Sequence, residues 1–265
     1  MVSRADVFEN RYHLQGYLEA LTAIHIGTGS NAASLDPRLA DNGVVRLSRD
    51  QRPYLPGSSL KGVCRAWLAR VLRGQGLAVC QRECPGAVWE ALCPVCQLFG
   101  TQGFGGRLFF ADAPAETWTH HSTTEIRTGV SVDLDSGRAI PGRLFTIEVV
   151  PAGHRFRMEV YAENVDDGDR HHLDMLRQAL SEGMIAIGGG STRGLGRMRL
   201  VDVREWMDTV QTLGRLLAPA GVSRARLIAL LAATDAEELS WTQVETLYDQ
   251  AVQRPKEANT DGAVR

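Results

Sequence analysis

The chain has 265 residues, 44% of them hydrophobic and 23% charged, which suffices for the core of one ordinary domain with an appendage. Its net charge of -2 argues against a basic protein that coats nucleic acid without selectivity. No apolar run reaches membrane-spanning length and residues 1–12 show no signal-peptide pattern, so we expect a soluble, cytoplasmic protein that binds no membrane.

The N-terminal part predicts a strand followed by a polar loop. Apolar and polar side chains alternate over residues 11–26, as in a half-buried strand. The polar loop that follows carries acidic residues at Asp36 and Asp41. A short apolar segment from Val44 then leads to the next element.

Residues 55–73 predict the helix around which the rest of the chain is organised. Apolar residues recur there at helical spacing; Cys64 lies on this buried stripe, and Ser58 is the expected N-cap. Instead of the acidic residue that usually meets the positive end of a helix, the first turns carry Lys61, followed by Arg65 on the same face. This predicts a bound anion such as phosphate at the helix start. The alternative is a lysine that only extends into solvent.

Four of the five cysteines predict a metal site. They follow the pattern C-x3-C-x8-C-x2-C in a loop of about residues 78–98, and they are Cys80, Cys84, Cys93 and Cys96. Four close thiolates in an intracellular chain fit a structural Zn²⁺ better than disulfides, which the cytosol reduces. Because four protein ligands close the coordination shell, this zinc would fold the loop and would not catalyse. The alternative is a set of reduced, half-buried thiols.

The middle of the chain predicts strands around an excursion. Residues 107–113 predict a buried strand. Residues 114–143 are polar and contain the hairpin signal Asp-Ser-Gly, so we expect an extended hairpin or loop that projects from the body. Residues 144–150 and 156–162 alternate around a turn, which predicts a second hairpin or one long bent strand.

A helix over residues 171–182 and a glycine-rich loop over 188–196 follow. No helix succeeds the glycines and no Gly-Lys-Ser/Thr is present, which excludes a dinucleotide fingerprint and a P-loop. We expect a loop that lets a backbone partner approach closely, with Arg193 and Arg197 beside it. The alternative is a connection that needs glycine only for tight packing.

The C-terminal part predicts helices. After a strand over residues 198–203, residues 204–253 show apolar stripes at helical spacing, the first of which includes Trp206. We expect a helical appendage that packs or docks a partner. Residues 254–265 are polar and are expected to form a disordered tail.

Together the elements follow a β-α-β-β-α-β order, which predicts an α+β, ferredoxin-like fold with insertions. Six motifs resemble, in order, those of the RAMP superfamily of repeat-associated proteins, and most of all the backbone subunits of type III CRISPR effector complexes. They are IHIGTGS (24–30), YLPGSSLKG (54–62), CPVCQLFG (93–100), RLFFADA (107–113), VPAG (150–153) and GGGSTRGLGRMRL (188–200). The resemblance implies an RRM-like palm over residues 1–203, with residues 114–143 as a projecting β-hairpin thumb.

The resemblance also implies an RNA partner. Members of this family assemble along a guide crRNA, pair it with a target RNA, and contact neighbouring backbone subunits and other effector subunits. Such contacts to RNA phosphates read no sequence, because pairing with the guide supplies specificity. The residues expected to bind RNA are Ser58, Ser59, Lys61, Arg65, Arg127, Gly189, Gly190, Ser191, Arg193 and Arg197.

Catalysis is a further implication of the resemblance. Many members cleave target RNA through an aspartate in the loop after the first strand, with Mg²⁺ or Mn²⁺. The family pattern resembles Asp-Ser-Pro-Val, and its nearest equivalent here begins at Asp41, with Asp36 as the competitor. The chain departs from the pattern by Asn-Gly in place of Ser-Pro, and an Asp before Asn-Gly is also an ordinary turn residue.

Two other functions stay open at this point. The chain could be a purely structural RNA-binding subunit without catalysis. It could also process guide precursors, but that activity normally uses a general base such as histidine, and the glycine-rich loop contains none.

Overall fold

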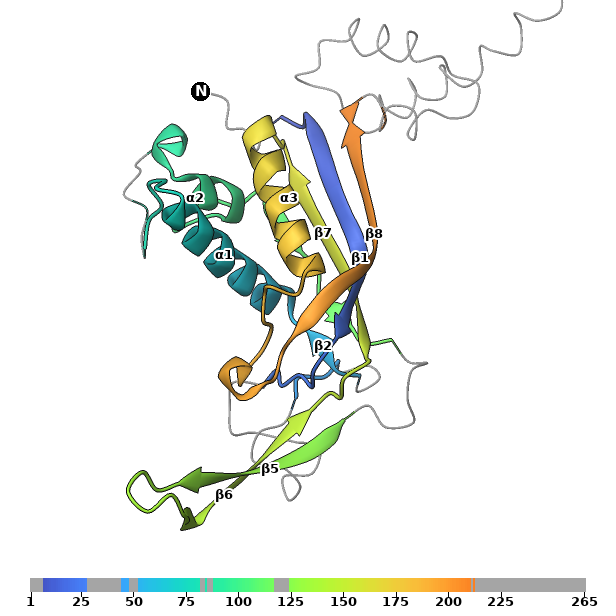
Figure 1. The fold of residues 1–265 in the computed structure, drawn as a ribbon. Coiled ribbons are helices and arrows are strands. Elements are labelled where there is room, and N and C mark those ends of the chain that lie inside the picture. Colours follow the sequence, from blue (N-terminus) through green and yellow to red (C-terminus); the bar gives the residue numbers. More distant parts are fainter. Residues whose placement is uncertain are drawn as a thin grey trace, which may run out of the picture.

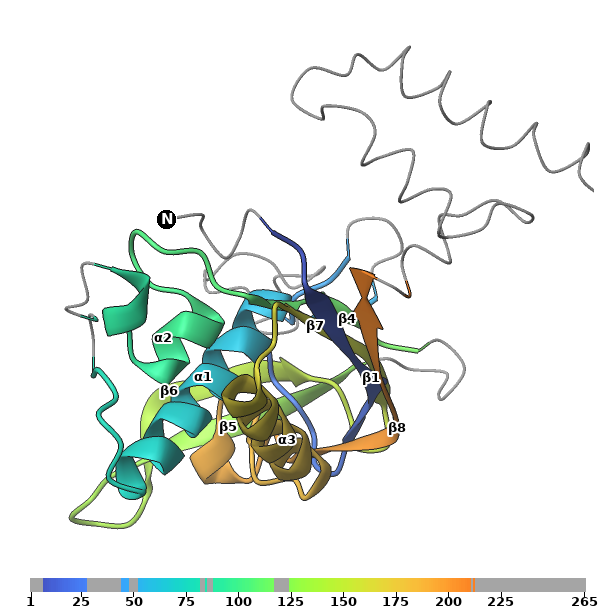
Figure 2. The same cartoon turned by 90° about the horizontal axis from the view of Figure 1, so that it is seen from above.

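The structure is a computed structural model that describes residues 7–27, 44–47, 52–81, 84, 88–116, 124–210 and 212. Within these ranges the chain forms the expected mixture of helices and antiparallel strands (Figure 1). A four-stranded antiparallel sheet has the strand order β3-β7-β1-β8. Helices α1 and α3 cover one face of this sheet, as the view from above shows (Figure 2).

The elements follow the chain in a simple order. They are β1 (Asn10–Ala20), β2 (Tyr54–Leu55), α1 (Gly57–Gly74), the short helix η1 (Trp89–Ala91), α2 (Pro94–Phe99), β3 (Leu108–Phe110), β4 (Ala113–Pro114), β5 (Glu125–Val132), β6 (Ala139–Val149), β7 (Arg155–Glu163), α3 (Asp167–Ser181), η2 (Ser191–Arg193) and β8 (Met198–Thr209). None of the helices within the described ranges has both the length and the apolarity that crossing a membrane requires.

Strand β1 lies in the middle of the sheet and pairs with β7 on one side and β8 on the other. Its alternate side chains, including Tyr12 and Leu18, are buried under the helices. The sequence predicted this strand up to residue 26, but β1 ends at Ala20. Beyond it the chain turns, and Ile24 then bridges Val150, which lies outside the four-stranded sheet.

Helix α1 buries the predicted stripe against the sheet. Leu60, Cys64, Leu68 and Leu72 are each at most 1% exposed. Cys64 is therefore a core residue, as predicted, and burial raises the pKa of its thiol to about 12. Burying these side chains contributes roughly 1.5–3 kcal/mol each for the larger ones, which makes this contact a main support of the fold.

Helix α3 begins four residues before the predicted start at His171. Asp166 accepts a hydrogen bond from the backbone N–H of Asp169, and the Asp169 carboxylate accepts one from the backbone N–H of Asp166, which forms a capping box. Asp169 also forms a two-pronged ion pair with Arg107, at 2.6 and 2.9 Å. Both side chains are buried, so the start of α3 is fixed to the segment that enters β3.

Strands β5 and β6 form a hairpin that projects from the sheet (Figure 1). We call this hairpin, residues 125–149, the projecting hairpin. It begins and ends later in the chain than the predicted excursion of 114–143, and it takes up residues 144–149, which we expected to form a hairpin or one long bent strand with 156–162. The expected hairpin is wrong, because β6 pairs with β5, while β7 pairs with β1 and β3.

Strand β8 extends beyond the predicted strand end at residue 203. It continues to Thr209, so residues 204–209 are strand and not part of a helical appendage. The prediction failed because pairing with β1, which lies almost 200 residues earlier, outweighs the local spacing of apolar residues. The remaining predictions for 213–253 and 254–265 lie outside the described residues.

A row of four rings crosses the open face of the sheet. Phe109, Tyr161, His13 and Trp206 come from β3, β7, β1 and β8 and are cross-strand neighbours. Phe109 stacks on Tyr161 with centroids 4.6 Å apart, and His13 stacks on Trp206 at 4.5 Å. We call this set the aromatic row, and its pairwise contacts stabilise the sheet.

The buried pair of Arg107 and Asp169 yields a test of stability. Replacing Asp169→Ala leaves the Arg107 charge buried without its counter-charge and opens the capping box. We expect the free energy of unfolding, measured by urea denaturation, to fall by about 3–5 kcal/mol. Asp174→Ala, which removes a half-exposed carboxylate from the same helix, should change it by less than about 1 kcal/mol. Equal losses in the two variants would contradict the role given to the buried pair.

Candidate nucleic-acid interface

The start of helix α1 is held differently from the prediction. The helix begins at Gly57, its N-cap is Pro56, and no side chain caps it in the usual way. The carboxylate of Asp112 instead accepts a hydrogen bond of 2.7 Å from the Gly57 N–H. Ser58 is therefore not the N-cap, and it is exposed, as is Ser59. One anion at this helix start is thus supplied by the protein itself.

Glycine is required at position 57 by close packing. A Cβ atom there would lie 2.3 Å from the backbone oxygen of Phe110. The same closeness brings Asp112, two residues after Phe110, to the first N–H of the helix. The YLPG and FFADA motifs therefore contact each other directly.

Lys61 and Arg65, the two cations predicted to hold phosphate, lie on α1 in different surroundings. Lys61 is half-buried, and burial, with a smaller effect from the neighbouring Arg65, lowers the pKa of its ammonium group. Arg65 donates hydrogen bonds of 2.8 Å to the Gly100 carbonyl and 3.2 Å to the Cys96 sulfur. Both bonds connect Arg65 to the cysteine loop and to the end of α2, so Arg65 has a structural role that the sequence did not indicate.

In the glycine-rich loop, two glycines are required for tight packing, the second of the two alternatives that the sequence left open. A Cβ atom at Gly188 would lie 2.5 Å from the His25 oxygen, and one at Gly196 would lie 2.3 Å from the Ile187 oxygen. Both residues also have positive φ angles, so these two glycines serve the fold. Between them, η2 places Ser191 and Arg193 on the surface, and both are exposed.

The glycine-rich loop lies against the base of the projecting hairpin. Leu195 packs against Val149 and Ala23 in a small apolar cluster. The Arg193 guanidinium lies 6.0 Å from the centre of the Phe145 ring on β6. Loop and hairpin base thus form one continuous part of the surface, in which Gly189, Gly190 and Arg197 also lie.

Arg127 lies further out, on β5 opposite Ile147. It is half exposed, and its guanidinium lies 4.0 Å from the Glu125 carboxylate. The two residues stand on the same strand, and the pair is too exposed to fix either side chain. Arg127 is therefore carried by the projecting hairpin and is not brought next to Lys61 by any described contact.

Asp36 and Asp41 lie outside the described residues, but both ends of their loop are anchored. Gly27 and Val44 bridge each other, and the Val44 N–H donates to the Glu148 carboxylate at 2.9 Å. Glu148 is buried at the end of β6 and also forms an ion pair with Arg46. We call Glu148, Val44 and Arg46 the anchor of the loop.

His25 belongs to the same region. Its Nδ1 donates a hydrogen bond of 2.8 Å to the backbone oxygen of Glu148, and it bridges Gly189. Sequence reasoning missed Glu148, although a charged residue in the otherwise apolar run LFTIEVV was an available signal. The role of Asp112 could not be read from any local pattern, because its partner Gly57 is 55 residues away.

The four predicted cysteines come together. Their sulfur atoms all lie within 4.8 Å of one another; Cys80 and Cys96 are 3.4 Å apart, and Cys80 and Cys93 are 3.6 Å apart. A tetrahedral zinc site with Zn–S bonds of about 2.3 Å needs sulfur–sulfur distances of about 3.8 Å. The donor set and its spacing therefore fit a metal ion such as zinc.

The thiols of this cluster already share protons. Burial would raise the pKa of Cys93, but hydrogen bonds with Cys80 and Cys96 outweigh burial and lower it to about 7. Burial, followed by those same sulfur contacts, raises the pKa of Cys96. A metal ion would replace the shared protons and draw all four groups to the thiolate form.

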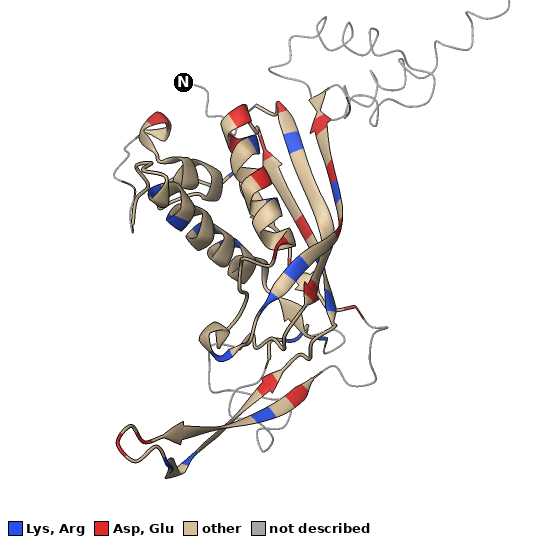
Figure 3. Cartoon of the chain, in the orientation of Figure 1, with Lys and Arg blue, Asp and Glu red and all other residues tan. Residues whose placement is uncertain are grey.

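Basic residues are distributed unevenly over the molecule (Figure 3). Helix α1 carries Lys61, Arg65, Arg70 and Arg73 and no acidic residue. On the sheet and on α3, in contrast, arginines alternate with carboxylates to which they are paired, as in Arg155 with Glu19 and Arg177 with Glu205. Among the described residues, exposed or half-exposed cations without an ion pair thus lie on α1 and on the glycine-rich loop, and also at Arg138 and Arg143 in the projecting hairpin and at Arg204 on β8.

Comparisons with known proteins give relatives along most of the chain. Three proteins named "CRISPR system Cms endoribonuclease Csm3" are similar to it. The one from Methanocaldococcus jannaschii is 29% identical, over 72% of this chain and 79% of its own. The one from Methanothermobacter thermautotrophicus is 24% identical, over 74% and 86%, and the one from Enterococcus italicus is 27% identical, over 77% and 94%.

The fold also has a solved counterpart. A chain in a cryo-EM structure of the type III-B Cmr-beta bound to cognate target RNA superposes with a TM-score of 0.55 at 18% identity. The match covers 74% of this chain and 61% of that one, so this chain spans about three fifths of its length and the likeness concerns the fold alone. Residues 17–199 match the family model of the RAMP superfamily, and the chain belongs to that superfamily.

Proposed function

We propose that this chain is a crRNA-binding backbone subunit of a type III CRISPR effector complex, and that it cleaves the target RNA paired with the guide. The observation that carries this proposal is its similarity to three proteins named as Csm3 endoribonucleases, over 79–94% of their length. The partners are guide crRNA, target RNA, neighbouring copies and other effector subunits.

The finer architecture follows the same proposal. The strand order β3-β7-β1-β8 with two helices on one face supports a ferredoxin-like, RRM-like palm. The projecting hairpin is the proposed thumb, and residues 78–98 are the proposed zinc loop. The palm reaches Thr209 and not residue 203, while a helical appendage up to residue 253 and a tail over 254–265 remain predictions.

The proposed RNA path joins two basic regions of the surface. Lys61 on α1 and Arg193 with Arg197 on the glycine-rich loop provide charge, and exposed Ser58, Ser59 and Ser191 provide hydrogen bonds. Such contacts reach phosphates and sugars and leave the bases of the guide free for pairing. Gly189, Gly190 and Arg127 complete the proposed contacts, while Arg65 acts on this path chiefly by connecting α1 to the cysteine loop.

The proposed cleavage uses Asp41. Its carboxylate would accept the proton of a target 2′-hydroxyl, whose oxygen attacks the adjacent phosphorus while the bond from phosphorus to the 5′-oxygen breaks. The leaving oxygen takes up a proton, so the products carry a cyclic phosphate and a 5′-hydroxyl. A divalent cation such as Mg²⁺ or Mn²⁺ would stabilise the charge that develops on the phosphate. Asp41 is preferred to Asp36 because it is only three residues from the anchored Val44.

Cleavage by the assembled complex tests this function. With Mg²⁺ and a guide-complementary RNA, we expect cuts at regular intervals. Asp41→Ala should slow them by at least about 100-fold, since it removes a general base, while the affinity for the target is kept. The measurement is the rate of product formation on a denaturing gel.

Asp36→Ala is the matched control, because it removes an aspartate from the same loop. It should cut at the rate of the unaltered complex. Unchanged cutting in Asp41→Ala, or loss of cutting in Asp36→Ala alone, would show that the assignment is wrong. A complex that binds target but never cuts would instead favour a purely structural subunit.

The RNA path predicts a change in the salt dependence of binding. Replacing Lys61→Ala and Arg193→Ala together removes two proposed phosphate contacts. For single-stranded RNA, the slope of log affinity against log salt should become shallower by about 1.4. Fluorescence anisotropy across a salt series measures it, and an unaltered slope would exclude these residues as phosphate contacts.

The cysteine cluster is proposed to hold a structural Zn²⁺. The purified chain should contain about one zinc ion, and Cys96→Ser should lose it and unfold at a lower temperature, because a tetrahedral site needs all four ligands. Cys64→Ala is the control: it opens a small space in the core and lowers stability, but it should keep the zinc. Metal analysis decides, and full zinc content in Cys96→Ser would contradict the assignment.

A further inference from the structure

A groove runs along the outer side of α1, between the helix and the cysteine loop. Its volume is about 620 Å³. Small residues of α1, Gly62, Ala66 and Ala69, form its floor, and the loops that carry Gln81 and Thr101 form its other side. We call it the α1 groove. None of the residues assigned above to RNA lines it except Arg65.

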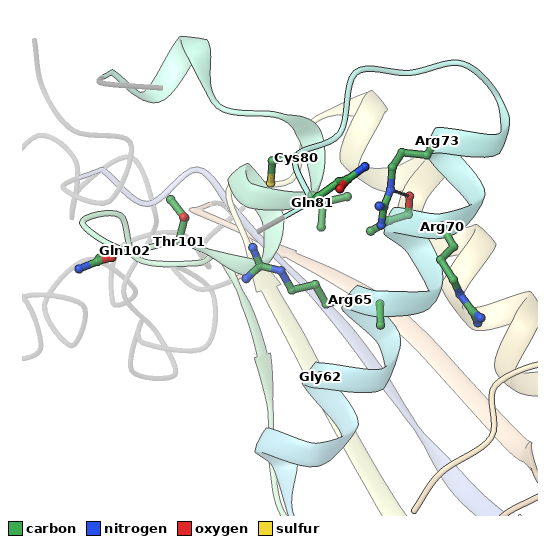
Figure 4. A pocket seen from close by; sticks show the side chains of 11 residues that line it. Gly62, Arg65, Arg70, Arg73, Cys80, Gln81, Thr101 and Gln102 are labelled. Carbon is green, nitrogen blue, oxygen red and sulfur yellow. Dashed lines mark hydrogen bonds between the residues drawn. The ribbon is translucent and has the colours of Figure 1, made fainter. Parts of the chain in front are cut away.

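Three arginines make the α1 groove positively charged. Arg65, Arg70 and Arg73 line it, and its wall contains no Asp or Glu and no aromatic side chain. Residues 51–82 contain no acidic residue. Figure 4 shows Arg65 extending from α1 toward the loop with Thr101 and Gln102. Arg73 leaves the helix farther along, and Arg70 extends from the opposite side of the helix in this view.

Two of the three guanidinium groups, those of Arg65 and Arg73, are held by hydrogen bonds to backbone carbonyls. Arg73 donates to the Ala69 carbonyl at 2.9 Å, and Arg65 donates to the Gly100 carbonyl and the Cys96 sulfur. Within the described ranges, none of the three groove arginines forms an ion pair with a carboxylate. Arginines that are positioned but uncompensated bind phosphate well, because their planar N–H donors fit its oxygens in pairs.

The chemistry of the wall favours nucleic acid over protein. Gln81, Thr101 and Gln102 are neutral hydrogen-bonding side chains of the kind that contact phosphate and sugar. A protein partner would be expected to find an apolar or aromatic centre, and the lining offers small residues instead. The small floor also allows a phosphodiester backbone to approach the helix closely.

We infer that the α1 groove is a second phosphate-binding site, in which Arg70 and Arg73 hold the backbone of the guide RNA. The inference rests on the proposed function, and it extends the RNA path from Lys61 toward the C-terminal end of α1. Arg65 and Arg73 are eight residues apart, which places them about 12 Å apart along the helix axis. The groove therefore spans more than one phosphate of a strand.

The test is RNA binding by the full chain with Arg70→Ala and Arg73→Ala combined. The probe is a single-stranded RNA, and its affinity is measured across a salt series. Loss of two phosphate contacts should make the slope of log affinity against log salt shallower by about 1.4. The matched control, Arg157→Ala with Arg199→Ala, removes two exposed arginines from the open sheet face and should leave the slope unchanged.

The outcomes separate this inference from the proposed function. An unchanged slope in the groove variant, with a shallower slope in the variant of Lys61 and Arg193, overturns the groove and keeps the RNA path. In assembled complexes, the groove variant should retain less guide after a salt wash. Full guide retention with weaker target binding, or with loss of neighbouring subunits, would overturn the inference in favour of a target or protein site.

Discussion

Helix α1 packs its apolar stripe against the sheet, and this contact determines where the charges of the molecule lie. A helix that is buried along one side turns its polar residues away from the core. Here these residues include four cations, and α1 itself contains no acidic residue, so the packing of the apolar stripe also decides where the cations lie. The carboxylate of Asp112 fixes the start of the helix, and Arg65 fixes its middle to the cysteine loop. The proposed RNA contacts depend on a helix that cannot rotate about its axis.

The features that the sequence predicted well are those with a local cause. The stripe through Cys64 and the four clustered cysteines follow from spacing along a few turns of chain. The features it missed depend on distant partners: Asp112 replaces Ser58 at the helix start, and β1 draws residues 204–209 into β8. The spacing of apolar residues over 204–209 is compatible with a helix, and only the pairing with β1 makes this segment a strand.

In the candidate site, too, the residues with a local signal could be predicted and those that depend on distant contacts could not. Exposed, unpaired cations such as Arg193 could be named from the glycine-rich context, because side chains next to such a loop reach the surface. Whether each glycine serves the fold or a ligand could not be decided from sequence, since both need a missing Cβ. The approach of the His25 and Ile187 backbones decides it for Gly188 and Gly196. Asp36 and Asp41 remain predictions, and only the anchor at Glu148 is described.

The aromatic row limits where RNA can lie on this molecule. A sheet that binds RNA through aromatic side chains needs ring faces that are free to receive bases. Here one face of the His13 ring stacks on Trp206, and one face of the Tyr161 ring stacks on Phe109. The Arg11 guanidinium lies 5.2 Å from the centre of the Tyr161 ring. Bases arriving at the middle of the sheet would meet ring edges and salt bridges. The two central rings are therefore less available for base stacking than Phe109 and Trp206 at the ends of the row, which are 37% and 38% exposed.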